Sequence, residues 1–98
     1  MTWSISDDKI NKYLLDANHP IGASKARFFS RIGFSLGDIQ TMKRALLNHP
    51  NTATLIDTKH NQWGVRVQYR CDILAPNGRK YCIITVWQDK LLVTAYPG

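Results

Sequence analysis

The sequence predicts an α+β fold in which three N-terminal helices pack on one face of a four-stranded antiparallel sheet. Apolar residues recur with helical spacing from about residue 6 to 49, and alternate with polar residues from about 52 to 97. The second half also contains two short turn sequences that would reverse consecutive strands. Because 98 residues suffice for one small core, we expect a single domain, 1–98.

The expected helices have recognisable features. The first begins after Ser6, a favourable N-cap residue. The second covers residues 22–32, and the third begins with Ser35 and Asp38 in a variant of the capping box. The apolar stripe of the first helix consists of Ile10, Tyr13, Leu14 and Ala17.

The sheet is expected to contain strands at residues 52–58, 63–74, 80–88 and 91–97. A two-residue Asn77-Gly78 turn would join the second strand to the third, and a two-residue Asp89-Lys90 turn would join the third to the fourth. This register places Thr85 opposite both Arg70 and Thr94. A slip of one residue would exchange the two faces of the affected strand.

The same register gives the sheet an unusual face directed away from the helices. Arginine and hydroxyl groups suit phosphate, and exposed aromatic side chains suit base stacking. The alternative is that these cross-strand pairs only stabilise the sheet. The nucleic-acid-binding residues predicted on this face are Arg66, Arg70, Thr85 and Trp87.

The charge, the cysteines and the absence of known motifs indicate which partners and cofactors to expect. Thirteen Lys and Arg residues against seven acidic residues give a net charge of +6, which favours a nucleic-acid partner over a membrane, although a basic surface can also serve solubility alone. Cys71 and Cys82 would lie diagonally on the inner face of the sheet, as free thiols rather than a disulfide. No zinc spacing, Walker loop or GxGxxG motif is present, so we expect no metal and no cofactor.

The chain shows no signal for a membrane or for secretion. Its apolar runs are shorter than the roughly 20 residues that span a bilayer, and its N-terminus lacks an apolar signal region. We therefore expect a cytoplasmic protein.

Lys25 interrupts the apolar stripe of the second helix, which also contains Phe28, Phe29 and Ile32. A positive charge is unfavourable near a helix N-terminus. Three alternatives follow: the lysine reaches past the phenylalanines to solvent, pairs with a buried aspartate, or points into a cleft to bind phosphate. His19, in the preceding turn, is either a general acid or base or a residue that caps the helix.

The patterns "YLLDANHPIGASKARFF…GF" and "NG…TVW…LVTAYP" resemble a family of small bacterial domains of unknown function that occur alone and in toxin-type proteins. The order of helices and strands and the terminal "TAYP" are also similar to the barnase/EndoU/colicin/RelE-like ribonuclease toxins. This resemblance implies one catalytic site containing His19, Lys25, Thr94 and Tyr96, and an acidic antitoxin or immunity protein as a partner. Barnase-type enzymes use a glutamate base, and this chain contains no Glu, so a histidine would have to replace it.

Together these features predict a metal-independent ribonuclease-like toxin or RNA-processing domain that binds RNA phosphate between the second helix and the sheet. His19 would transfer protons, Lys25 and Arg70 would stabilise the phosphate charge, Thr94 would donate a hydrogen bond, and Tyr96 would stack a base or assist proton transfer. The alternative is a small non-catalytic adaptor that binds RNA or a protein partner through the same face.

Overall fold

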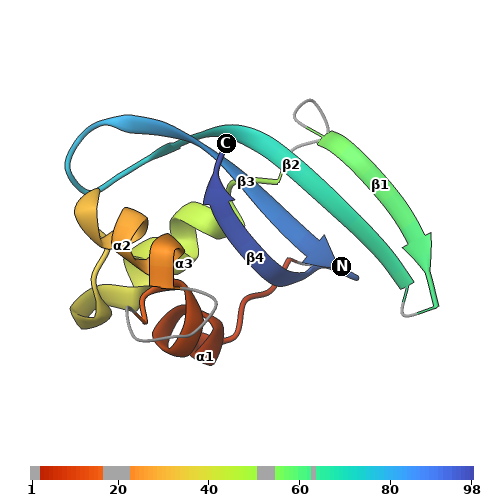
Figure 1. Ribbon diagram of the computed structural model, residues 1–98, viewed down its shortest axis with the longest axis horizontal. Helices are drawn as coiled ribbons and strands as arrows, with labels where there is room; N and C mark the ends of the chain where they lie inside the picture. The colour runs from red at the N-terminus through yellow and green to blue at the C-terminus, as the bar shows by residue number, and fades with distance from the viewer. Residues whose placement is uncertain (1–2, 17–22, 51–54, 63) are drawn as a thin grey trace.

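The computed structural model describes residues 3–16, 23–50, 55–62 and 64–98. Helices and turns occupy the first half and lie on one face of a four-stranded antiparallel sheet with strand order β1-β2-β3-β4, as predicted (Figure 1). The two layers share one core around Phe29, Leu46 and Trp87. None of the helices in the described ranges is long and apolar enough to cross a membrane. The elements are α1 (Asp7–Lys9), the π-helical turn η1 (Ile10–Leu14), α2 (Ala23–Arg31), the 3₁₀ turn η2 (Leu36–Asp38), α3 (Ile39–Leu47), β1 (Leu55–Asn61), β2 (Gly64–Leu74), β3 (Lys80–Gln88) and β4 (Leu91–Pro97).

The first helix begins at the predicted cap and then widens. Ser6 Oγ accepts a hydrogen bond from the Lys9 backbone N–H at 3.1 Å. The helix continues as η1, in which the Leu15 N–H donates to the Ile10 carbonyl at 2.9 Å. Ile10 is buried in the core, whereas Tyr13 is half-buried at its margin. The widened turn therefore leaves the Tyr13 hydroxyl available to a neighbouring element.

The prediction of a capping box at the start of the third helix is wrong. Ser35 makes no side-chain cap hydrogen bond and precedes only the short turn η2. The α-helix begins three residues later, where the Asp38 carboxylate accepts a hydrogen bond from the Thr41 N–H at 3.3 Å. The turn separates the two residues of the expected box.

The β2–β3 hairpin differs by one residue from the predicted register, because its loop has three residues. Thr85 pairs with Tyr69 instead of Arg70. A two-residue turn would place Pro76 at the last paired position of β2, where it has no N–H to donate. Instead Ala75 donates to Arg79 across a loop that ends with Gly78 at φ +87°.

The β3–β4 hairpin has the predicted two-residue turn, with Asp89 and Lys90 at φ 50° and 70°. The register then shifts by one residue between Val86 and Trp87, because β4 contains a bulge. Thr85 therefore pairs with Ala95 instead of Thr94.

These shifts reverse the faces of β3. Thr85 and Trp87 are 0% exposed in the core, so their predicted positions in an exposed nucleic-acid-binding face are wrong. The predicted row Arg70–Thr85–Thr94 does not form. Both cysteines are free as predicted, but they do not share the inner face. Cys71 faces His49 on α3's side, whereas the Cys82 sulfur lies 3.4 Å from Arg70 Nε on the opposite face.

A buried hydrogen-bonded chain fixes β3 against the end of α3. Trp87 Nε1–H donates to Thr85 Oγ1 at 2.8 Å, and the Thr85 hydroxyl lies 2.8 Å from His49 Nδ1. His49 Nε2 lies 3.0 Å from the Cys71 carbonyl. Because a carbonyl only accepts, the neutral ring carries its proton on Nε2 and accepts the Thr85 proton at Nδ1. Burial lowers the pKa of His49 below its ordinary 6.5, against the opposing effect of the Cys71 and Ile83 backbone.

We predict that the hydrogen bonds of His49 make the free energy of unfolding depend on pH. The folded protein binds the His49 proton less readily than the unfolded chain does, so the free energy of unfolding falls as the pH is lowered below about 6.5. His49→Ala should cost roughly 2–4 kcal/mol at neutral pH, because it leaves buried polar groups unpaired. Urea denaturation across the pH range measures both effects.

The control for this experiment is His60→Gln, which changes an exposed histidine on β1. It should leave the wild-type pH dependence intact, whereas His49→Gln should flatten it. Equal pH profiles for wild type and His49→Gln would contradict the assigned role of His49.

Candidate functional site

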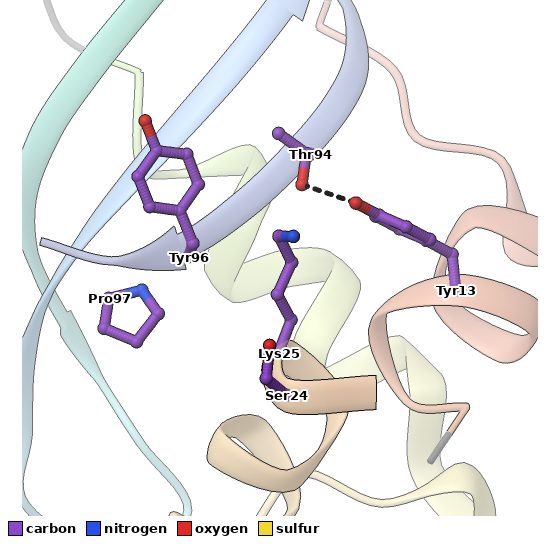
Figure 2. Close-up of a pocket in the computed structure, with 6 residues that line it drawn as sticks. All are labelled: Tyr13, Ser24, Lys25, Thr94, Tyr96 and Pro97. Carbon is purple, nitrogen blue, oxygen red and sulfur yellow. Dashed lines mark hydrogen bonds between the residues drawn. The ribbon is translucent and has the colours of Figure 1, made fainter. Parts of the chain in front are cut away.

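A groove of about 490 Å³ lies where α2 and η1 meet the edge strand β4 (Figure 2). It combines an ammonium, two hydroxyl groups and two phenol rings. Its lining residues are Tyr13, Ser24, Lys25, Thr94, Tyr96 and Pro97. Among the described residues, no group of three or more His, Cys or Asp side chains is placed to hold a metal ion.

Lys25 enters this groove from the first turn of α2. The next residue, Ala26, and Phe29 one turn later are buried, which fixes the orientation of the helix. Figure 2 shows the Lys25 side chain extended from α2 toward β4, into the groove that Thr94 also lines. No ion pair between described residues includes Lys25. Lys25 therefore pairs with no described aspartate and lines the groove, which is the position that the third alternative predicts.

Tyr13 closes the groove from η1. Its hydroxyl lies 3.2 Å from Thr94 Oγ1, and its ring centroid lies 5.6 Å from Lys25 Nζ and 4.9 Å from Lys9 Nζ. Burial raises the pKa of Tyr13, but the hydrogen bond with Thr94 and the ammonium groups of Lys25 and Lys9 together lower it below the ordinary value of 10.0. The Thr94 hydrogen bond and the positive charges thus make this phenol a stronger acid than a free one.

Thr94 and Tyr96 occupy alternate positions of β4 and share one face of it. The residue between them, Ala95, is buried in the core. Strand β4 forms one edge of the sheet, and Thr94 brings it against η1, with its Oγ1 3.2 Å from the Tyr13 hydroxyl. The two side chains are half-buried and border the groove.

Arg70 and Arg66 lie on the same sheet face but do not line the groove. Arg70 pairs with Ile84, which pairs with Tyr96, so Arg70 lies two strand spacings, or about 10 Å, from Tyr96. Arg66 is four residues away along β2, and its Nε donates to Gln88 Oε1 at 3.4 Å. Both arginines are exposed, as predicted.

The predicted site is brought together in part. Lys25, Thr94 and Tyr96 border one groove, Thr85 and Trp87 are buried elsewhere, and His19 lies outside the described residues. Sequence reasoning assigned Tyr13 only to the apolar stripe. Its hydroxyl was the available signal, since a phenol at the edge of a core needs a polar partner.

Residues 2–98 match the family described as domain of unknown function DUF6883. The chain belongs to this family. Its fold is similar to that of a chain in a contact-dependent growth inhibition toxin–immunity protein complex from Klebsiella pneumoniae 342, with a TM-score of 0.77. The two are 11% identical, and the match covers 96% of this chain and 98% of the other, so the likeness concerns the fold. No curated protein sequence matches the chain.

We predict that Lys25→Met raises the pKa of Tyr13 toward its ordinary value, because the substitution removes the nearby ammonium and keeps the aliphatic part of the side chain. NMR titration of the tyrosine Cζ resonances, assigned with Tyr13→Phe, measures this shift. Lys12→Met is the matched control, since Lys12 pairs with Asp8 at 3.8 Å on the exposed side of the same helical segment. Equal Tyr13 titration in wild type and Lys25→Met would contradict the described electrostatics.

Proposed function

We propose that the groove binds an RNA phosphate and that the domain is a metal-independent endoribonuclease of the toxin type, acting on cytoplasmic RNA. The observation that carries this proposal is the convergence of Lys25, Thr94 and two tyrosines, Tyr13 and Tyr96, on one groove. A positive charge and a hydroxyl suit the phosphate, and an aromatic ring suits an adjacent base.

The proposed reaction is an internal transesterification. The 2′-oxygen of the substrate attacks the adjacent phosphorus, the bond from phosphorus to the 5′-oxygen breaks, and the products carry a 2′,3′-cyclic phosphate and a 5′-hydroxyl. Lys25 stabilises the charge that builds on the phosphoryl oxygens, and Thr94 donates a hydrogen bond to one of them. Tyr96 stacks against the neighbouring base. His19, assigned from the sequence alone, accepts the 2′-hydroxyl proton.

The exposed sheet face extends the proposed binding surface beyond the groove. Arg70, about 10 Å from Tyr96 across the sheet, would contact a phosphate on the next nucleotide, and Arg66 lies on the same face four residues away along β2. The net charge of +6 supports a polyanionic substrate. It also favours an acidic inhibitor, such as an antitoxin or immunity protein, as the protein partner. The similar fold found in a toxin–immunity complex supports this assignment.

We predict that the purified protein cleaves total RNA in the presence of EDTA and leaves 2′,3′-cyclic phosphate ends. Lys25→Met should reduce the rate by about 100-fold or more, because it removes charge stabilisation made in the transition state, without lowering thermal stability. His19→Ala should cause a comparable loss. Gel analysis of a labelled RNA, with end-group identification by mass spectrometry, measures cleavage.

Lys12→Met is the control for charge alone, since it removes one positive charge outside the groove. It should retain near-wild-type cleavage. If wild type binds RNA without cleaving it, the adaptor function is favoured. If Lys25→Met retains full activity, the groove is not the catalytic site.

RNA affinity should fall steeply with salt, because binding displaces counterions from the phosphates. Arg70→Ala should weaken binding by about tenfold or less. It should also reduce the slope of log affinity against log salt concentration by about one, which corresponds to the loss of one phosphate contact. Fluorescence anisotropy with a 2′-deoxy oligonucleotide, which cannot undergo the cleavage step, measures both. Binding that does not change with salt would contradict the proposed phosphate contacts.

A further inference from the structure

We propose that Tyr13 is the general acid of the groove and protonates the 5′-oxygen as it leaves the phosphorus; this role rests on the proposed ribonuclease function. The sequence pattern assigned this residue only to the apolar stripe, and the reaction as described above leaves the source of that proton open.

Tyr13 is held so that its hydroxyl borders the groove. Its backbone is anchored because Ile10 and Leu14 on the same turn are buried in the core. Its hydroxyl is directed at β4, 3.2 Å from Thr94 Oγ1, and lies at the border of the groove (Figure 2). The phenol hydroxyl is thus held at the border of the groove rather than inside the core.

Two ammonium groups lie close to the ring. Lys9 Nζ is 4.9 Å and Lys25 Nζ is 5.6 Å from its centroid. Positive charge at this distance stabilises the phenolate relative to the phenol, so the proton is released more easily. Together with the Thr94 hydrogen bond, these charges lower the pKa of Tyr13 below its ordinary value. A strengthened phenol acid is suited to a poor leaving group such as an alkoxide.

The step balances with groups already named. As the bond between phosphorus and the 5′-oxygen breaks, its electron pair goes to that oxygen, which takes the proton from Tyr13 Oη. The resulting phenolate is stabilised by the ammonium groups of Lys25 and Lys9, which lie 5.6 and 4.9 Å from the ring centroid. Water returns a proton to Tyr13 after the 5′-hydroxyl product leaves. The 2′-hydroxyl proton goes separately to the general base.

A sulfur substitution in the substrate tests this role directly. An RNA whose 5′-bridging oxygen is replaced by sulfur has a thiolate leaving group, which departs without protonation. Tyr13→Phe should cleave the all-oxygen RNA about 100-fold or more slowly than wild type. On the sulfur-containing RNA it should cleave within a few-fold of wild type. This rescue separates acid catalysis from a structural role.

Tyr81→Phe is the matched control. It removes a phenol hydroxyl that accepts a hydrogen bond from Asn77 at 2.8 Å, outside the groove. Its rates should equal those of wild type on both substrates.

A second measurement does not depend on removing the hydroxyl. Difluorotyrosine placed at position 13 lowers the phenol pKa, so the descending limb of the pH–rate profile on the all-oxygen RNA should move to lower pH. The same amino acid at position 81 should leave the profile unchanged.

The outcomes separate the two proposals. Absence of cleavage by wild type overturns the ribonuclease function and this role with it. Cleavage by wild type, with Tyr13→Phe impaired equally on both substrates or on neither, overturns the role of Tyr13 and leaves the ribonuclease function standing. An unmoved pH–rate profile with the fluorinated residue also overturns the role.

Discussion

The arrangement of the sheet depends on the buried hydrogen bonds that join Trp87, Thr85 and His49. Thr85 is a polar residue with no exposed surface, and it is stable in the core because both its neighbours complete its hydrogen bonds. Because Thr85 bonds to His49 at the end of α3, the odd-numbered residues of β3 face the helices. The pairing Thr85↔Ala95 then buries Ala95 and turns Thr94 and Tyr96 toward the other face. The surface that carries the proposed chemistry is thus set by a contact in the core.

The groove places positive charge where the helix itself disfavours it. Lys25 lies in the first turn of α2, near the positive end of the helix dipole, and Lys9 lies near the same phenol. No carboxylate pairs with Lys25 among the described residues. A phosphate in the groove would receive favourable interactions from the ammonium, from the helix N-terminus and from Thr94 together. A bound phosphate would therefore offset the unfavourable position of the Lys25 charge.

The sequence predicts most of the elements but not the surfaces they form. Periodicity predicted all of β2, β3 and β4 within a residue, because apolar alternation and turn residues are local properties. The prediction of which β3 residues face the core was wrong, although Pro76, which lacks an N–H, indicated a longer loop before this strand. The bulge in β4 has no comparable local signal. Lys25 was identified because it breaks a stripe, whereas the role of Tyr13 emerges only when β4 is placed beside η1.

The central claim is that RNA phosphate binds between α2 and β4. Titrating ¹⁵N- and ¹³C-labelled protein with a 2′-deoxy oligonucleotide, which binds but is not cleaved, tests this claim most directly by NMR. The account predicts that the largest shift changes occur at Lys25, Thr94 and Tyr96, with smaller changes at Arg70. Changes confined to β1 and the adjoining end of β2, with the groove residues unaffected, would contradict it.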